Sequence, residues 1–247
     1  MYGVIWKLSA ILLLWAAPAA ASVTCERLSF EETRFSACWV DVATGELRLF
    51  LNGPEGTPYG SFDAIEEALG PLAFGMNAGM YHEDRRPVGH YMEDGTEAMR
   101  VIPTPGPGNF GMLPNGILCI SAGSVRVWET RRYVEDTPAC DHATQSGPML
   151  VIDGDLHPRL LPDGTSRRIR NGVGTTDDGG RAIFVISDEG VNFHTFARIF
   201  RDHFGLNQAL YLDGNISRMH APRLDRSDRG VPMGPIVGVL ARPEESG

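Results

Sequence analysis

Short stretches with alternating hydrophobic and polar residues recur along the chain, a period of two residues that is typical of β-strands with one buried face. Residues 35–41 and 46–51 both alternate, and Ala43-Thr44-Gly45 between them predicts a hairpin turn. Other short stretches, some of them continuously apolar as in a strand buried on both faces, predict further strands, and those between positions 109 and 128 predict a meander. We expect these strands at residues 72–76, 89–93, 98–102, 109–113, 116–120, 125–128, 149–152, 181–186, 208–212 and 235–240.

Two segments have the longer period of an amphipathic helix. Residues 62–69 follow Ser61, whose side chain can cap the first turn, and they end at Gly70. Residues 192–204 place several apolar side chains on one face, as a helix that packs on a core requires. Many strands, few helices and a high content of glycine (29) and proline (17) predict an α+β fold with mostly antiparallel or mixed sheet.

The first 21 residues have the layout of an export signal. Lys7 precedes an apolar stretch at residues 8–17, and Ala19-Ala20-Ala21 offers a small-residue cleavage site before Ser22. An uncleaved signal anchor is the alternative, although the apolar stretch is short for a membrane span. No later stretch is long and apolar enough to cross a bilayer. We therefore expect an exported chain, periplasmic or secreted, with residues 22–247 in a single domain.

The chain has four cysteines, an even number with no Cys-x-x-Cys pair. In an oxidising compartment this predicts two disulfides, for which three connectivities are possible. The pairs Cys25–Cys38 and Cys119–Cys140 are favoured, because each closes a short local excursion of the chain. A zinc site is the weaker interpretation, since no cysteine has a partner at ligand spacing.

The formal net charge of −9 argues against nucleic acid as a partner, because an acidic surface repels phosphate backbones. Positive charge gathers locally in Arg159, Arg167, Arg168 and Arg170. Such a cluster would attract an anionic group of a ligand, and a solvated loop edge is the alternative. The histidines form no pair at metal-ligand spacing, so we expect no histidine-bound metal and no cofactor. A calcium ion held by surface carboxylates is the alternative that the sequence leaves open.

Four segments place a polar residue beside glycine where an apolar stretch ends. Glycine allows close backbone approach to a ligand and leaves amide groups free to donate hydrogen bonds. Each segment alone is also typical of an ordinary turn. Together they supply the acid, cation, amide and hydroxyl that a polar, anionic substrate needs. The segments are residues 77–79, 145–148, 170–174 and 213–215.

These segments, with Pro114-Asn115-Gly116 among them, resemble in content and order the motifs of the phosphodiester glycosidase family. The resemblance runs from Asn77-Ala78-Gly79-Met80-Tyr81 to Leu212-Asp213-Gly214 and covers nearly all of the expected mature chain. It implies an α+β fold with the site on loops at strand ends, and hydrolysis of a sugar–phosphate diester. Arg170-Asn171-Gly172 stands where family members commonly have Arg-Thr-Ala, and no glycine-serine run follows Gly214. These departures indicate a bacterial branch and leave the sugar open.

The implied chemistry depends on two residues. A phosphate monoester leaves the anomeric carbon with little general acid help, because it is already a stable anion, whereas ordinary glycoside hydrolysis uses two carboxyls. Arg170 is expected to hold the departing phosphate with its planar fork, and Asp213 to act as nucleophile or as base for a water. Further residues are expected to contact the substrate: Asn77, Gly79, Ser146, Gly147, Asn171, Gly172, Gly214 and Asn215.

The sequence thus predicts an exported hydrolase that cleaves a glycosyl phosphodiester at the anomeric carbon. The alternative is a non-catalytic module that binds phosphorylated envelope glycans, for which the same arginine and glycine segments would serve. A third interpretation is a structural exported domain in which these segments are only turns. The sugar, the aglycone, the stereochemical outcome and the oligomeric state do not follow from the sequence.

Overall fold

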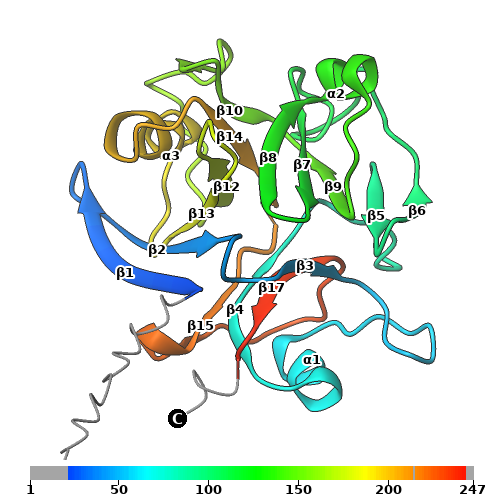
Figure 1. The fold of residues 1–247 in the computed structure, drawn as a ribbon. Coiled ribbons are helices and arrows are strands. Elements are labelled where there is room, and N and C mark those ends of the chain that lie inside the picture. Colours follow the sequence, from blue (N-terminus) through cyan, green and yellow to red (C-terminus); the bar gives the residue numbers. More distant parts are fainter. Residues whose placement is uncertain (1–21, 214, 243–247) are drawn as a thin grey trace, which may run out of the picture.

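The computed structural model describes residues 22–213 and 215–242 (Figure 1). The predicted export signal, residues 1–21, and the predicted contact residue Gly214 lie outside the described residues. Within the described part, the chain forms three sheets in which every strand pair is antiparallel, with a few short helices. This confirms the α+β class with mostly antiparallel strands and few helices.

The first sheet has seven strands and lies in the upper left of Figure 1. Its interior strand β13 is buried on both faces, which agrees with its nearly continuous apolar sequence. The order across the sheet is β1 (Val23–Phe30), β2 (Thr33–Asp41), β13 (Arg181–Ser187), β12 (Asn171–Thr175), β14 (Gln208–Tyr211), β10 (Met149–Ile152) and β11 (Asp155–Leu156).

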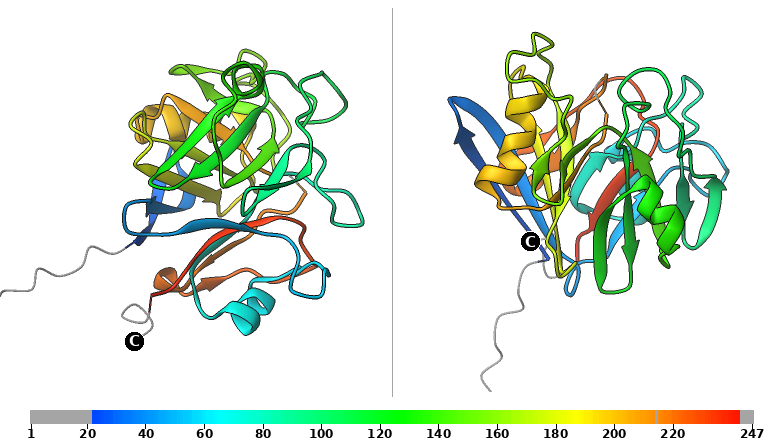
Figure 2. Two further views of the ribbon diagram at one scale, coloured as in Figure 1. Left: turned by 45° about the vertical axis from the view of Figure 1, so that its right-hand side comes forward. Right: turned by 90° about the horizontal axis from the view of Figure 1, so that it is seen from above.

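The other two sheets have five strands each. Figure 2 shows one of them in the lower part of the molecule, with the red strand β17 beside the cyan β4. Its order is β16 (Arg226–Ser227), β15 (Met219–Ala221), β4 (Leu72–Asn77), β17 (Ile236–Leu240) and β3 (Leu47–Phe50). The remaining sheet has the order β6 (Thr96–Met99), β5 (Tyr91–Glu93), β9 (His142–Ser146), β7 (Gly116–Ser121) and β8 (Ser124–Glu129).

The three sheets share one hydrophobic core, to which strands from each contribute. Phe74 of β4 and Phe184 of β13 meet there with ring centroids 4.8 Å apart, and Leu118 of β7 packs in the same cluster. Strand β13 sends Phe184 into this core, while its neighbour Val185 faces the opposite side of the sheet. The alternation of side chains along a strand explains how one strand serves two cores.

Each sheet is covered on its other face by a helix. Ser61 caps the first of these, since its Oγ accepts a hydrogen bond from the Ala64 amide at 3.1 Å, and Gly70 ends it. No helix in residues 22–213 and 215–242 is long and apolar enough to cross a membrane. The helices are α1 (Phe62–Leu69), α2 (Thr130–Asp136), α3 (Phe193–Arg198), the π-helix η1 (Ile199–His203) and the 3-10 helix η2 (Pro222–Leu224).

Two disulfides join the described cysteines in the predicted pairs. Cys25 and Cys38 lie opposite each other on β1 and β2. Cys119 of β7 is bonded to Cys140, which precedes β9 in the same sheet. Both bonds therefore staple neighbouring segments within one sheet.

Several local predictions were wrong. Residues 43–45 do form a turn, in which the Gly45 amide donates to the Asp41 carbonyl at 2.7 Å, but the flanking strands β2 and β3 belong to different sheets. Alternation reveals the buried face of a strand and not its partner. Residues 109–113 are turns and not the first strand of a meander. The helix that starts after its N-cap, Asn192, continues as a π-helix beyond Arg198.

Candidate active site

The four predicted segments come together where strands end. Asn77 is the last residue of β4, Ser146 the last of β9 and Asn171 the first of β12, and Asp213 follows β14 by two residues. Hydrogen bonds connect them. The Ser146 hydroxyl donates to the Leu212 carbonyl, and the Asp213 amide donates to Asn171 Oδ1 at 3.1 Å. Segments far apart in the sequence thus meet at one place.

Asn77 lies at the centre of these contacts and is fully buried. Its Oδ1 accepts hydrogen bonds from Asn171 Nδ2 and, at 2.9 Å, from the Arg218 backbone amide. Two donors on one atom identify it as the carboxamide oxygen. Asn77 Nδ2 has no hydrogen-bond partner among the described residues. A buried donor of this kind is costly unless a ligand or water satisfies it.

The Asp213 side chain borders a cavity of about 350 Å³ and is only 8% exposed. One carboxylate oxygen accepts the Asn215 amide at 3.0 Å, which is an Asx-turn, and the Ser217 hydroxyl donates to the Asp213 carbonyl at 3.2 Å. These contacts fix the carboxylate at the cavity wall. The cavity is lined by Met80, Pro107, Gly108, Asn109, Phe110, Asp213 and Asn215.

Most of these lining residues escaped the sequence prediction. Residues 107–110 belong to the stretch whose end was predicted as a strand, and the structure shows turns there instead. The closely spaced Gly106, Gly108 and Gly111 in this stretch were the available sign of a loop. Among the lining residues, only Asp213 and Asn215 were predicted.

Arg170 directly precedes β12, and Asp213 follows the neighbouring strand β14 by two residues. Gly172 pairs with Tyr211, and the Leu212 amide donates to the Asn171 carbonyl at 3.2 Å. One further step along both strands sets Arg170 opposite Asp213. The two residues therefore lie at the same end of two adjacent strands of the seven-stranded sheet.

The guanidinium of Arg170 is nevertheless occupied by other groups. Nε donates to the Val191 carbonyl at 2.8 Å, Nη2 to the Ser166 carbonyl at 2.9 Å, and Nη1 to the Tyr211 hydroxyl at 3.3 Å. The guanidinium carbon lies 3.6 Å from the Phe193 ring centroid, and the residue is 1% exposed. Burial lowers the pKa of Arg170, and the Tyr211 hydroxyl opposes this shift. Arg170 does not line the Asp213 cavity, in contrast to the expected phosphate contact.

Three of the predicted glycines are required by close packing within the protein. A Cβ at Gly79 would lie 2.4 Å from the Gln145 carbonyl oxygen, and one at Gly147 would lie 2.7 Å from Asn115 Cβ. A Cβ at Gly172 would lie 2.8 Å from the Leu210 carbonyl oxygen. These glycines let strands and loops approach one another closely.

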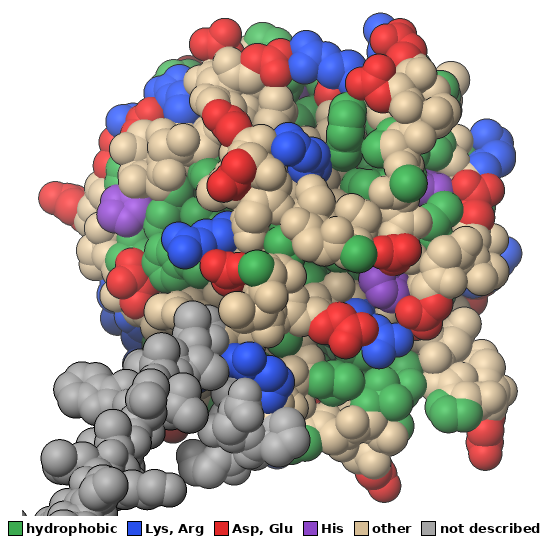
Figure 3. All heavy atoms as spheres, in the orientation of Figure 1, with side chains coloured by type: hydrophobic (Ala, Val, Ile, Leu, Met, Phe, Trp, Pro, Cys, Tyr) green, Lys and Arg blue, Asp and Glu red, His purple; other side chains and the backbone are tan. Residues whose placement is uncertain are grey.

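The rest of the predicted arginine cluster is separate from Arg170. Arg159, Arg167 and Arg168 are exposed, whereas Arg170 is buried. Figure 3 shows acidic and basic side chains interspersed on the face it displays, without a large patch of one sign. The electrostatic potential of this face is therefore not expected to attract a polyanion.

Three residues that the sequence analysis did not assign stand beside the site. Tyr81 follows Met80, and its hydroxyl is buried without a hydrogen-bond partner among the described residues. The guanidinium of Arg85 lies 5.6 Å from the Tyr81 ring centroid. Burial raises the pKa of Tyr81, and the Asp213 carboxylate raises it further, while Arg85, the Gly234 backbone amide and Arg218 lower it. The only available signal was the position of Tyr81 at the end of the Asn77 segment.

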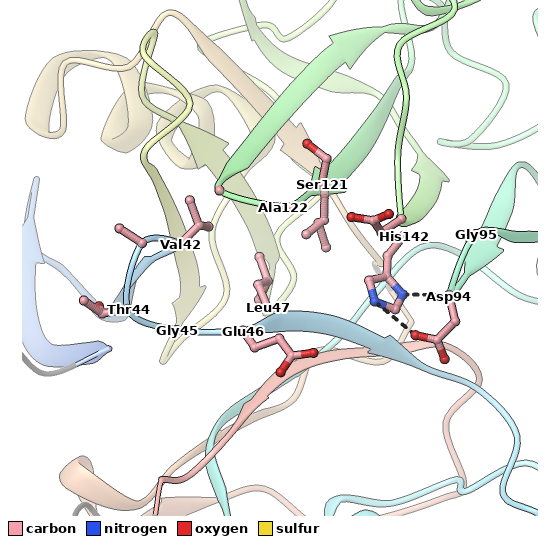
Figure 4. A pocket seen from close by; sticks show the side chains of 14 residues that line it. Val42, Thr44, Gly45, Glu46, Leu47, Asp94, Gly95, Ser121, Ala122 and His142 are labelled. Carbon is pink, nitrogen blue, oxygen red and sulfur yellow. Dashed lines mark hydrogen bonds and ion pairs between the residues drawn. The ribbon is translucent and has the colours of Figure 1, made fainter.

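A larger cavity of about 620 Å³ lies elsewhere, beside the turn of residues 43–45 (Figure 4). His142 points into it beside Asp94, whose amide donates to His142 Nδ1 at 3.3 Å and whose carboxylate lies 3.6 Å from Nε2. Burial lowers the pKa of His142, and Asp94 opposes this shift. None of the predicted site residues borders this cavity. The convergence of strand ends therefore identifies the smaller cavity as the candidate site.

Comparisons with known proteins agree with the arrangement of the fold. The model of the phosphodiester glycosidase family matches residues 71–234. The protein YigE of Escherichia coli (strain K12) is 31% identical over 205 residues, which cover 82% of this chain and 80% of YigE.

Solved structures share the fold at low identity. The catalytic domain of zebrafish N-acetylglucosamine-1-phosphodiester alpha-N-acetylglucosaminidase, auto-inhibited by its pro-peptide, superposes with a TM-score of 0.64 at 11% identity. The match covers 92% of this chain and 86% of that one. A hypothetical protein from Synechocystis gives a TM-score of 0.60 at 12% identity, covering 90% of this chain and 62% of that one.

Proposed function

The chain belongs to the phosphodiester glycosidase family, and from that membership we propose that it is a hydrolase that cleaves a glycosyl phosphodiester at the anomeric carbon. The observation that carries the proposal is the Asp213 carboxylate, which is held at the wall of a 350 Å³ cavity where four strand-end segments meet. A fixed carboxylate at a cavity is the group that this reaction requires.

The reaction breaks the bond between the anomeric carbon and the bridging phosphate oxygen. The bonding electron pair stays with that oxygen, so the leaving group is a phosphate monoester, and a water oxygen finally bonds to the sugar. Asp213 either attacks the anomeric carbon itself or takes the proton of the attacking water. A second carboxyl is less necessary than in ordinary glycoside hydrolysis, because the monoester leaves as a stable anion.

Asn77, Ser146 and Asn171 act in this proposal mainly as positioning residues. Ser146 and Asn171 form hydrogen bonds with Leu212 and Asp213, respectively. Asn77 in turn accepts a hydrogen bond from Asn171. Sugar hydroxyls would meet the polar groups that face the cavity from Asn109 and Asn215. Rigid support of this kind keeps a reacting group within a fraction of an ångström of its productive position.

Arg170 stabilises the end of β14, the strand that precedes Asp213. Its guanidinium ties the Ser166 and Val191 carbonyls to the Tyr211 hydroxyl, two residues before Asp213. We assign it the role of fixing the end of β14, in place of the phosphate contact that the sequence predicted. A buried guanidinium with all three nitrogens engaged would lose these hydrogen bonds if it turned toward a ligand.

Export is part of the same proposal. Two disulfides in the described residues fit an oxidising compartment, where such bonds persist. We propose that residues 1–21 direct export, that residues 22–247 form one domain, and that the protein works in the periplasm or outside the cell.

The test uses the purified chain of residues 22–247 with N-acetylglucosamine 1-phosphodiesters and, separately, with aryl glycosides. We expect turnover of the diesters, at least 1,000-fold reduced in Asp213→Asn by analogy with the loss of other essential catalytic groups. Asp163→Asn is the matched control, because Asp163 is exposed and lies outside the cavity. Turnover of aryl glycosides alone would refute the phosphate part. Tight binding of the diesters without any turnover would instead favour a non-catalytic glycan-binding module.

A further inference from the structure

The proposed reaction needs a binding place for a phosphate, and Arg170 does not supply it. We infer that Tyr81, Arg85 and Arg218 form the phosphate-binding part of the site, with the Tyr81 hydroxyl donating a hydrogen bond to a phosphate oxygen. The inference rests on the proposed function for the identity of the ligand. The location of the phosphate-binding site is inferred from the positions of these three side chains.

Tyr81 has a fixed ring and an unsatisfied hydroxyl. Its backbone forms a β-bridge with Pro87, and its ring packs on Gly234, where a Cβ would lie 2.4 Å from Tyr81 Cγ. The hydroxyl is shielded from solvent and makes no hydrogen bond of good geometry in the described part of the chain; the Gly234 amide lies near its oxygen, and no acceptor for its proton is found there. Buried tyrosine hydroxyls normally find a partner. A ligand oxygen would supply the missing one.

Arg85 lies over the Tyr81 ring, with its guanidinium carbon 5.6 Å from the centroid. Its backbone has φ +72°, an unfavourable conformation for a residue with a side chain. The Arg85 amide donates to the His82 carbonyl, and Nη1 donates to the Glu83 carbonyl at 2.8 Å. No carboxylate of residues 22–213 or 215–242 forms an ion pair with Arg85. Its positive charge is thus available to an anion.

Arg218 lies in the segment that follows Asp213, its guanidinium packs beside Gly230, and its charge lowers the pKa of Tyr81. Its backbone amide donates to Asn77 Oδ1 at 2.9 Å. This fixes the Arg218 backbone to the same oxygen that accepts a hydrogen bond from Asn171. Nη1 donates to the Val231 carbonyl at 2.6 Å. No ion pair to Arg218 occurs within the described residues, as for Arg85. Arg85 thus lies over the Tyr81 ring, and Arg218, which lines a separate cavity with Gly230, is a second arginine without an ion pair among the described residues.

This arrangement suits the leaving group of the proposed reaction. Two guanidinium groups can neutralise the charge that develops on the phosphate as the bridging bond breaks. Burial and the nearby Asp213 carboxylate raise the pKa of Tyr81, so its hydroxyl stays protonated and serves as a neutral donor. Tyr81 directly follows Met80, which lines the Asp213 cavity, and the proposal sets the carboxylate and the phosphate-binding groups on either side of the bond to be cut. Charge separation of this kind places the sugar at Asp213 and the phosphate at Tyr81.

The experiment measures the Kd of methyl phosphate by calorimetry, without turnover, for the wild type, Tyr81→Phe, Arg85→Met and Arg218→Met. We expect Kd to rise about tenfold in each arginine variant, equal to about 1.4 kcal/mol, and about fivefold in Tyr81→Phe, about 1 kcal/mol by the same relation. Arg86→Met is the matched control with an unchanged Kd. It is the next residue along, is exposed, and is ion-paired with Asp84 at 2.6 Å.

The outcomes separate this inference from the proposed function. Diester hydrolysis with unchanged Kd in all three variants would refute the phosphate site and leave the hydrolase intact. Weakened binding in the variants without any diester hydrolysis would keep the phosphate site and refute the hydrolase. A wild type that does not bind methyl phosphate at millimolar concentration would also refute the site. Thermal unfolding of each variant checks the fold, and Arg85→Met, on an exposed turn, carries the test if Arg218→Met unfolds.

Discussion

The side chains of Asn77 and Asn171 are hydrogen-bonded to each other across two different sheets. Asn77 ends β4 in one five-stranded sheet, and Asn171 begins β12 in the seven-stranded sheet. Asn171 Oδ1, the other end of this carboxamide, accepts a hydrogen bond from the Asp213 backbone amide at 3.1 Å. The position of the Asp213 backbone therefore depends on how the two sheets are aligned. The buried carboxamide of Asn171 connects Asp213 to both sheets.

Replacing Asn171 should damage stability and the site together. Asn171→Ala removes the acceptor of the buried Asp213 amide, which costs about 1–3 kcal/mol of unfolding free energy. Asn171→Asp keeps the shape but sets a carboxylate oxygen against Asn77 Oδ1, so we expect an equal or larger loss at pH 7. Urea unfolding measures both. Asn207→Ala, in an exposed asparagine that contacts only Asp177 with its side chain, should change the free energy by less than about 0.5 kcal/mol.

Arg170 should prove to be a stability residue. Arg170→Met keeps much of the aliphatic volume but strips the Ser166 carbonyl and the Tyr211 hydroxyl of their donor, and it removes the cation over Phe193. We expect a loss of roughly 2–4 kcal/mol in unfolding free energy. Arg168→Met is the control, since Arg168 is exposed and two residues away. A variant with unchanged stability but a higher Kd for methyl phosphate would return Arg170 to the phosphate role.

The sequence predicts well those features that neighbouring residues determine. The helix at residues 62–69 has its predicted bounds, because the Ser61 cap and the Gly70 stop are local signals. The partner of a strand is a long-range property. Residues 47–50 alternate as a strand should, yet nothing within them selects β17 over β2 as a neighbour. The edge strand β1 was not predicted at all. Its sequence is polar on its exposed face, and it forms a strand through its pairing with β2.

The candidate site follows the same rule. The polar residues beside glycine were predicted because each marks the end of a strand, where ligand pockets tend to form. That strand ends of three different sheets meet at one place is a long-range property that no segment alone reveals. The inward direction of Arg170 was harder to predict. It shares a strand face with Gly172 and Gly174, and both glycines lie against apolar side chains, Phe196 and Phe200. Two glycines at alternate positions were a sign that this face packs against a helix.

Removal of one disulfide should lower stability without changing the fold. Cys119 and Cys140 are 21 residues apart, and closing a loop of that length contributes about 3 kcal/mol in the chain-entropy account. We expect the variant with both cysteines changed to serine to lose about that amount in urea unfolding. Dithiothreitol should destabilise the variant further, because it still contains the Cys25–Cys38 bond. Equal stability of the oxidised wild type and the variant would contradict the prediction.

Acid should destabilise the protein through its buried histidines. His90, His142 and His157 are 2%, 5% and 1% exposed, and burial lowers the pKa of each below the usual 6.5. Below pH 6.5 the unfolded chain takes up protons that the folded chain does not, so stability is complete above that pH and falls as pH decreases toward the folded pKa. Urea unfolding between pH 7.5 and 5.5 measures the slope.

One variant isolates the contribution of a single ring. His142→Gln removes a titrating group and leaves every other one, so the difference between wild type and variant cancels the carboxylates that titrate nearby. We expect the wild type to lose more stability than the variant on acidification, by at most about 1.4 kcal/mol per pH unit, since one proton is involved. His82→Gln is the control, because His82 is exposed and its loss should leave the slope unchanged. Parallel pH profiles for wild type and His142→Gln would mean that Asp94 offsets the burial of His142 and keeps its charged form as stable as in the unfolded chain.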